Sequence, residues 1–276
     1  MKNHKSQLTK IFSKLSFALI LSATATTSFA FDKLEDAVAS KTRTAKFVAR
    51  DEFRHPVETL KFFGIKDNMT VVEISPGGGW YTEILAPYLK DNGQYIAAGY
   101  DPESSSNYFK SSAKRFNDKL AASPELYGKA QVSIMDAPDK MDFAEPKSAD
   151  LVVSFRNTHN WHSRGQTEIV YASIFKVLKP GGIFGVVQHR AGHSFPKDTG
   201  GELGYLKQSD VIKFAEKAGF QLLKKSNINA NPKDTRDHAN GVWDLPPSFG
   251  SKDKDREKYQ AIGESDRMTL KFVKKP

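Results

Sequence analysis

Cysteine is absent from this chain of 276 residues. Its absence excludes disulfide bonds, zinc sites with thiolate ligands and a lipid-modified cysteine at a cleavage site. A long apolar run is also missing, because "LSFALILSA" at residues 15–23 is shorter than the ~20 residues of a membrane-spanning helix. Internal repeats and low-complexity tracts are absent too. Hydrophobic residues still make up 39% of the sequence, which predicts a globular domain with a real core.

The N-terminal segment, from Met1 to Ala30, has the composition of a secretory signal peptide. It carries four lysines and no acid, continues into the apolar run and ends in "SFA", Ser28 to Ala30. A basic start, a short apolar middle and a small-x-small ending are typical of cleaved signals. We expect cleavage after Ala30, a periplasmic or secreted protein that starts at Phe31, and no stable membrane anchor after cleavage. The alternative is an uncleaved N-terminal anchor.

The formal net charge of the whole chain is +9. Without the four lysines of the N-terminal segment, the remaining basic and acidic side chains leave a formal charge of +5. Because the remaining lysines are interspersed with acids, we expect a solvated surface and no nucleic-acid partner. A protein without thiols also suits an oxidising compartment such as the bacterial periplasm.

Segments that favour helices and strands alternate after residue 65, following an expected helical extension at residues 31–64. In that extension we expect one helix over 32–49 and another that begins at Pro56 and ends at Gly64. Later helices are expected at 81–89, 105–123, 166–178 and 207–219. Strands are expected at 70–74, 94–100, 130–135, 149–155, 183–189, 220–228 and 268–275.

This alternation predicts an α/β fold. Helices between consecutive strands imply parallel strands with helices on both faces of the sheet. The last two strands have no expected helix between them, which predicts an antiparallel hairpin at the edge. We therefore expect a Rossmann-like, mostly parallel sheet of seven strands with an antiparallel last strand, over residues 65–276, with a long polar loop at about 230–267.

The stretch "VVEISPGGGW" at residues 71–80 joins the first of these strands to a glycine-rich turn. Ligands of open α/β sheets bind beyond the carboxyl ends of the strands, next to the first strand. Glycines permit positive φ and a close approach of the backbone, and the next helix directs free N–H groups toward an anion. The stretch thus favours a ligand-binding loop over a plain strand-to-helix turn.

Acids follow the next two strands. Asp101 ends the strand after the glycine-rich turn, where its carboxylate is placed to accept both hydroxyls of a ribose, and Asp136 is placed to accept from an adenine amine. A nicotinamide dinucleotide is disfavoured because the third glycine of its fingerprint is Thr82 here, and because Glu73 would repel a pyrophosphate. Glu73 is instead able to accept from a ligand ammonium group. These features favour S-adenosylmethionine, an adenosine that carries a zwitterionic amino acid.

The same elements carry a resemblance to a known family. "VVEISPGGGW", "YIAAGYD", "VSIMDAP", "DLVVSF", "IFKVLKPGGIFGVV" and "EKAGFQLL" resemble class I S-adenosylmethionine-dependent methyltransferases over about residues 55–274. "EFRHPVETLKFFG", "GWYTEILAPYL", "RNTHNWH" and "ESDRMTLKF" are similar to an exported, poorly characterised subgroup of methyltransferase-like proteins.

The resemblance implies a set of cofactor-binding residues. Asp101 would bind the ribose, and Asp136 with Ala137 the adenine. The other expected contacts of S-adenosylmethionine are Glu73, Ser75, Pro76, Gly77, Gly78, Gly79, Tyr81 and Phe155. Ser75 departs from the family pattern because it replaces the first loop glycine and precedes a proline. A serine fits there only with a negative φ, which we therefore expect.

Candidate catalytic residues follow the fourth strand, from which this fold usually reaches the substrate. They are Arg156, His159 and His162. A histidine is able to act as a general base toward a hydroxyl or amine acceptor. Alternatively, His159 merely packs the loop.

Several neighbours are candidates for supporting roles. His189 and Arg190, at the end of the fifth strand, are candidates to line the same pocket, while His193 is expected in a solvated loop. No carboxylate stands at ligand spacing near the histidines, so no metal is predicted. Trp243, Asp244 and Phe249 of the long loop are candidates for a lid.

The sequence therefore predicts an S-adenosylmethionine-dependent methyltransferase whose acceptor is a small molecule or an exposed protein group. An exported binding protein that retains the fold without catalysis is the alternative, because the cofactor is made in the cytosol. A nicotinamide-dependent oxidoreductase is disfavoured by the missing glycine and by the lack of a substrate domain.

Overall fold

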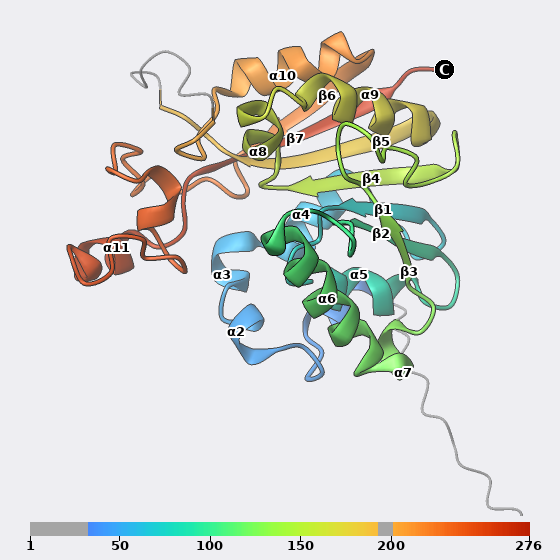
Figure 1. Cartoon of the computed structure of the whole chain (residues 1–276), viewed down its shortest axis with the longest axis horizontal. Coiled ribbons are helices and arrows are strands. Elements are labelled where there is room, and N and C mark those ends of the chain that lie inside the picture. The colour runs from blue at the N-terminus through green and yellow to red at the C-terminus, as the bar shows by residue number, and fades with distance from the viewer. Residues whose placement is uncertain (1–32, 193–200) are drawn as a thin grey trace, which may run out of the picture.

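A computed structural model describes residues 33–192 and 201–276 (Figure 1). The predicted signal peptide with its cleavage site after Ala30, and His193, lie outside these residues. Across the two described ranges, no helix is both long enough and apolar enough to cross a membrane.

Seven strands form one sheet in the order β3-β2-β1-β4-β5-β7-β6. The five strands from β3 to β5 are parallel, and β7 is antiparallel to both β5 and β6. The predicted fold class is therefore confirmed, including its antiparallel last strand. The strands are β1 Thr70–Ile74, β2 Gln94–Gly99, β3 Gln131–Ile134, β4 Ala149–Phe155, β5 Leu178–His189, β6 Phe220–Ser226 and β7 Arg267–Lys274.

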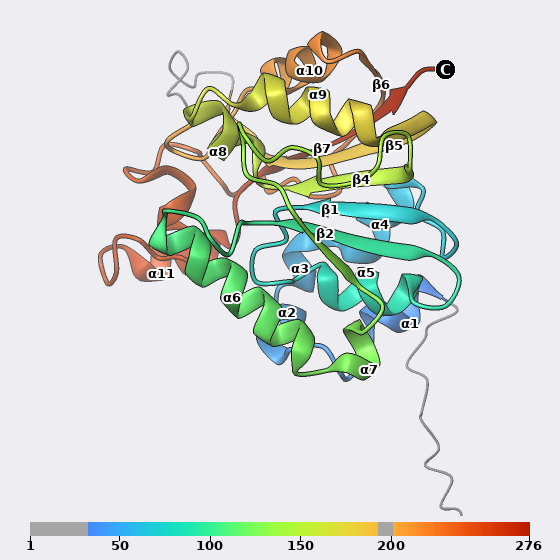
Figure 2. The ribbon, with the colours of Figure 1, turned by 45° about the vertical axis from the view of Figure 1, so that its right-hand side comes forward.

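Helices cover both faces of the sheet (Figure 2). Successive residues of β4 point to opposite faces, so Val152 joins one core while Leu151 and Val153 join the other. The first core is closed by α8 Thr158–Ser163, α9 Thr167–Val177 and α10 Gln208–Lys217. The second is closed by α1 Leu34–Val38, α4 Pro56–Phe63, α5 Thr82–Leu89, α6 Asn107–Ala121 and α7 Pro124–Tyr127.

The N-terminal extension corrects one expected helix. The predicted helix over 32–49 is divided into α1 and α2 Ala45–Val48, and α3 Asp51–Arg54 follows. Between α1 and α2, the hydroxyl of Ser40 accepts from the N–H of Thr42, a local bond that competes with helix formation. The helix α4 begins at Pro56 and is followed by Gly64 with φ of 85°, as expected.

The long segment at 230–267 is more ordered than a plain loop. It contains a short 3-10 helix, η1 Gly241–Asp244, and the helix α11 Arg256–Ile262. The strands β6 and β7 are antiparallel neighbours as expected, but the prediction of a hairpin is wrong because η1 and α11 lie between them. This segment lies beside the carboxyl ends of β4 and β5 (Figure 1).

Candidate functional site

A cavity of about 680 Å³ opens at the carboxyl ends of the central strands. Its wall comes from the α2–α3 segment, the loop after β1, the end of β2, α6, the β4–α8 junction and the end of β5, with Trp243 of the long loop. A volume of this size is in the range of pockets for small molecules and cofactors, roughly 300–1,000 Å³. Distant parts of the chain thus meet around one space.

The glycine-rich loop forms one side of this cavity. Ser75, Gly77 and Gly79 all have positive φ, of 50°, 60° and 81°. The expectation of a negative φ at Ser75 is therefore wrong. Its N–H donates to the carbonyl of Ala98 at 2.8 Å and its carbonyl accepts from the side chain of Asn157 at 3.3 Å, so neighbouring strands hold the left-handed backbone in place.

Within the loop, Gly77 and Gly78 line the cavity together with Ser75 and Pro76. A Cβ added to Gly77 would meet no atom within 4 Å, so its backbone faces open space. Gly79 differs, because its Cβ would lie 3.2 Å from the side chain of Lys119 on α6. Gly79 therefore shapes the turn without lining the cavity.

Glu73 is buried at the end of β1 and lines the cavity. Its Oε2 accepts from the hydroxyl of Tyr95 at 2.5 Å and from that of Thr82 at 3.1 Å. No residue of the described ranges donates to Oε1. Burial raises the pKa of Glu73 to about 7, although both hydroxyl donors oppose this rise. The free oxygen is available to a donor group of a ligand in the cavity.

Asp101 and Asp136 stand at the ends of β2 and β3 but do not line the cavity. Asp101 is only 4% exposed; its Oδ2 pairs with the ammonium of Lys140, and its Oδ1 accepts from the N–H of Glu103 at 2.9 Å. The hydrogen bond from Lys140 holds the pKa of Asp101 below its usual value. The carboxylate predicted to bind a ribose is thus occupied by a lysine of the chain.

Around Asp136 the backbone is tied to the same lysine. Asp136 exchanges backbone hydrogen bonds of 2.9 Å with Lys140 in both directions. Burial, followed by the nearby charge of Asp101, raises the pKa of Asp136. Ala137 packs against the first core, and its carbonyl accepts from the side chain of Gln166 at 2.7 Å. These residues support the edge of the site instead of its wall.

On the other side of β1, aromatic rings and Arg156 face the cavity. Tyr81 and Phe155 are stacked with their ring centroids 3.5 Å apart. Arg156 has a positive φ of 61°, fixed by a 2.7 Å bond from its N–H to the carbonyl of Val187. Burial lowers the pKa of Arg156 to about 10, and although the charge of Glu264 opposes this shift, Arg267 adds to it.

His159 and His189 lie beside Arg156, with ring centroids 5.5 Å apart. The Nδ1 of His159 is 3.4 Å from the side-chain oxygen of Gln188, and its buried Nε2 has no partner among the described residues. The Nδ1 of His189 is 2.5 Å from the hydroxyl of Ser265. Burial lowers the pKa of His159 to about 4 and that of His189 well below its usual value, so both rings are neutral near pH 7.

His162 does not join this group. Its ring lies 5.2 Å from the ring of Phe214 on α10, and it does not line the cavity. The short helix α8 directs His159 into the cavity and His162 toward α10. The sequence predicts no helix at these residues, so it does not predict that the two histidines point in different directions. The geometry therefore gives no support to His162 as a catalytic residue.

Several charged side chains in or next to the cavity are not predicted from the sequence, because their partners are distant in the chain. Arg50 and Arg54, on the α2–α3 segment, pair with Glu264 near the other end of the chain. Arg267 also pairs with Glu264, at 3.0 Å. Arg54 is 2% exposed and lies over the ring of Trp80, with 4.7 Å from its guanidinium carbon to the ring centroid. The charged motifs "RDEFR" and "ESDR" are the only local signal.

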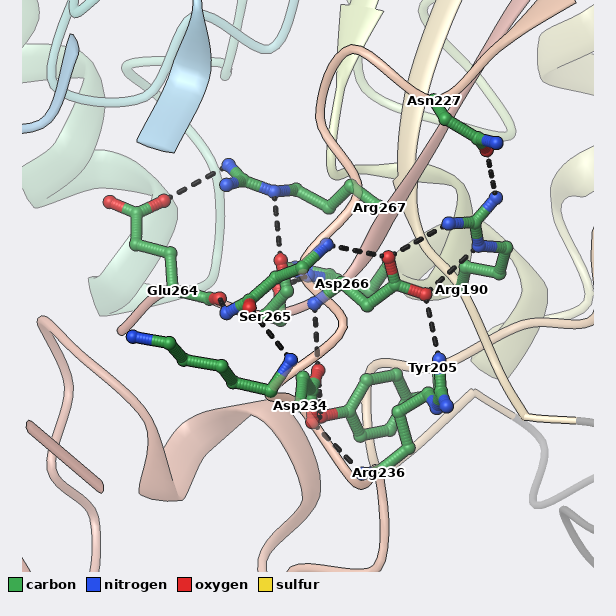
Figure 3. A network of polar contacts seen from close by, with 12 residues as sticks. Arg190, Tyr205, Asn227, Asp234, Arg236, Glu264, Ser265, Asp266 and Arg267 are labelled. Carbon is green, nitrogen blue, oxygen red and sulfur yellow. Dashed lines mark hydrogen bonds and ion pairs between the residues drawn. The ribbon is translucent and has the colours of Figure 1, made fainter. Parts of the chain in front are cut away.

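A second network fixes the long loop (Figure 3). Asp266 accepts two hydrogen bonds from Arg190, at 2.8 and 2.9 Å, and one from Arg236 at 2.9 Å. Asp234 accepts from the N–H of Asp266 at 2.7 Å and from the hydroxyl of Tyr205. Arg190, a candidate for the pocket wall, therefore anchors the loop instead.

Of the three lid candidates, only Trp243 lines the cavity. Asp244 is buried and accepts from Asn240, and the ring of Phe249 lies under the guanidinium of Arg256. Over the residues that the structure describes, no group of three or more His, Asp or Glu side chains is arranged to hold a metal ion.

Comparison with known proteins matches residues 72–186 to a family model described as a methyltransferase domain. This match spans less than half of the chain and holds its central strands. The match agrees with the predicted enzyme class and with S-adenosylmethionine as its cofactor, and the matched residues include the glycine-rich loop and β4.

Among sequences, the chain is similar to sterol 24-C-methyltransferase erg6 of Aspergillus fumigatus. The two are 27% identical over 194 residues, which cover 65% of this chain and 47% of the relative. The chain thus spans about half the length of this curated relative.

Solved structures share the fold. A SAM-dependent methyltransferase from Aquifex aeolicus superposes with a TM-score of 0.55 at 15% identity, over 82% of this chain and 93% of that one. Phosphoethanolamine N-methyltransferase 2 of Haemonchus contortus superposes with a TM-score of 0.52 at 17% sequence identity. The superposition covers 88% of this chain and 60% of that one. The [4+2]-cyclase SpnF superposes with a TM-score of 0.56 at 15% sequence identity, over 80% of each chain. Because one of these proteins is named as a cyclase, the fold alone does not determine the reaction.

Proposed function

We propose that the protein transfers a methyl group from S-adenosylmethionine to a small-molecule acceptor or an exposed protein group that enters the cavity. One observation carries the proposal: the glycine-rich loop of a methyltransferase domain opens directly on a cavity large enough for a cofactor and an acceptor. The opposite side of the cavity holds neutral imidazoles and arginines, which suit an acceptor.

The residues present fit the cofactor at the loop. Gly77 leaves open space beside the backbone, and the Oε1 of Glu73 is free to accept from an ammonium group. Asp101 would accept from the ribose hydroxyls after Lys140 moves away from its carboxylate. Tyr81 and Phe155 provide an apolar wall next to the loop. Asp136 and Ala137 would border the adenine from the end of β3.

When bound, S-adenosylmethionine supplies an electrophilic methyl group on a positively charged sulfur. Such a transfer depends more on holding the acceptor in position than on strong acid–base catalysis. Arg156 and Trp243 would position the acceptor, and the α2–α3 segment would exclude water from the loop side. If Nδ1 of His159 carries the ring hydrogen toward Gln188, its unpartnered Nε2 is able to accept a proton from the acceptor.

Calorimetric titration of the purified protein with S-adenosylmethionine and S-adenosylhomocysteine tests the proposal. We expect both to bind and Asp101→Ala to weaken each by at least about tenfold, because a buried acceptor of two hydroxyls is lost. Asp91→Ala, which removes an exposed carboxylate paired with Lys129, is the matched control and should leave binding unchanged. Absence of binding up to millimolar concentrations would refute the function.

A binding protein that keeps the fold without catalysis is the second candidate. It is favoured by the pairing of Asp101 with Lys140, which occupies the expected ribose site. This candidate would be eliminated if the wild type transferred a methyl group to any acceptor and Asp101→Ala abolished that transfer.

We also propose that the protein is exported, on the basis of the segment from Met1 to Ala30. Mass spectrometry of the N-terminus of protein recovered from the periplasm tests this proposal. A chain that begins at Phe31 is expected, and an intact Met1 in the cytosolic fraction would contradict it.

A further inference from the structure

Three arginines pair with a single carboxylate next to the cavity, and a fourth arginine lies near them. Glu264 pairs with Arg50, with Arg54 at 3.3 Å and with Arg267 at 3.0 Å. Arg156 lies close enough for its charge to be felt by Glu264, but it forms no ion pair with any described residue. Four positive charges therefore share one negative charge, and the cluster carries an excess of positive charge.

Two of these guanidiniums keep N–H groups without a hydrogen-bond partner among the described residues, although the Nε of Arg54 is paired with Glu264. Arg54 is 2% exposed, and its buried Nη2 has no hydrogen-bond partner within the described ranges. The guanidinium of Arg156 makes no hydrogen bond to the described residues either. Both side chains line the cavity. A buried polar group without a partner is costly, and an anion that enters the cavity would supply the missing acceptor.

The electrostatic balance supports this reading. Burial lowers the pKa of both Arg54 and Arg156. The positive charges of nearby arginines lower these pKa values further, because like charges repel. An anion between them would remove this repulsion and accept charge-assisted hydrogen bonds.

The position of the pair separates it from the adenosine end of the site. Asp101 follows β2, on one side of β1, whereas Arg156 follows β4, on the other. His189, at the end of β5, is next along the sheet and feels the charges of Arg54 and Arg156. The arginines thus stand with the histidines, on the side left for the acceptor.

We propose that the methyl acceptor is an anion whose carboxylate or phosphate group binds between Arg54 and Arg156. This inference rests on the proposed function and adds the class of its substrate. His159 and His189 would lie beside the reactive group of such an acceptor.

Calorimetry with simple anions tests the site without the cofactor. The probes are benzoate, inorganic phosphate and, as an uncharged analogue of benzoate, benzamide. Arg156→Gln is the main variant, because it leaves no ion-pair partner among the described residues unpaired. Arg115→Gln is the matched control: it removes the same charge from the same cavity, at an exposed position on α6.

We expect benzoate or phosphate to bind the wild type saturably and benzamide not to bind. Arg156→Gln should weaken the anion by at least about tenfold, and Arg115→Gln should change it by less than about twofold. The tighter of the two anions identifies the acceptor group as a carboxylate or a phosphate. No saturable binding of either anion, or equal weakening by both variants, overturns the proposal.

The carboxylate of the cofactor is the competing occupant of the arginine pair. Titrations with S-adenosylhomocysteine and with 5′-methylthioadenosine, which lacks the amino-acid group, distinguish it. We expect Arg156→Gln to leave both affinities unchanged. Selective weakening of S-adenosylhomocysteine would assign the arginines to the cofactor and overturn the inference. If neither nucleoside binds while the anions do, the proposed function fails and the anion site remains.

Discussion

The ammonium of Lys140 pairs with the Oδ2 of Asp101 at the end of β2, where the methyltransferase domain is expected to hold a ribose. Lys140 is half exposed and Asp101 is buried, so the lysine closes over the acid from the solvent side. A ribose that binds Asp101 has to displace this ammonium.

Removal of Lys140 should therefore strengthen cofactor binding. We expect Lys140→Met to raise the affinity for S-adenosylhomocysteine by up to about fivefold, since a partly exposed ion pair contributes little. Calorimetric titration measures the change, and Lys129→Met, which loses an exposed pair with Asp91, is the control. A lower affinity would show instead that Lys140 contacts the cofactor.

Replacement of Glu73 should change how stability depends on pH. The pKa of Glu73 is about 7 in the folded protein, above its value of 4.5 in the unfolded chain. At pH values between these two pKa values, Glu73 is protonated in the folded protein and loses its proton on unfolding. The free energy of unfolding therefore falls as pH rises through this window, by at most about 3 kcal/mol. Glu73→Gln should remove this fall.

Urea unfolding of both proteins at several pH values from 4.5 to 8 measures this difference. The exposed Glu145→Gln is the control and should follow the wild type. Parallel curves for wild type and Glu73→Gln would contradict the prediction.

Glycine at position 75 should not destabilise the protein, although glycine usually weakens folded structure. Ser75 holds a φ of 50°, which costs a non-glycine residue about 1–2 kcal/mol. Relief of this strain should offset the greater flexibility of glycine in the unfolded chain. The free energy of unfolding of Ser75→Gly should equal or exceed that of the wild type.

The control is Ser111→Gly, at an exposed position inside α6, which should lose about 0.5–1 kcal/mol. If Ser75→Gly loses as much as this control in urea unfolding, the strain at Ser75 is absent.

Loss of the Asp266 carboxylate should release the long loop. Asp266 is 1% exposed and neutralises Arg190 and Arg236, so Asp266→Asn leaves two partly buried guanidiniums without a counter-charge. We expect a loss of about 3 kcal/mol in unfolding free energy and faster proteolytic cleavage within 230–267. Asp253→Asn, exposed in the same loop, should behave as the wild type. Unchanged cleavage would mean that other contacts fix the loop.

Much of the fold follows from local patterns. The strand β1 spans the expected residues 70–74, and β4 spans 149–155, because buried β-branched runs bounded by turns are local signals. The extension is harder to predict, since the helix expected over 32–49 is interrupted by a turn whose hydrogen bond involves Ser40. Helix propensity there competes with side-chain bonding to the backbone.

The sequence by itself determined the order of elements, the glycine-rich loop and the position of acids after β2 and β3, because each depends on neighbours in the chain. Tertiary structure alone decided which side chains share the cavity. It gave Ser75 a positive φ through Ala98 and Asn157, and it turned His162 toward α10. It also brought Arg54 to Glu264 from the opposite end of the chain, a contact that no local pattern encodes because it arises only when the extension packs against β7.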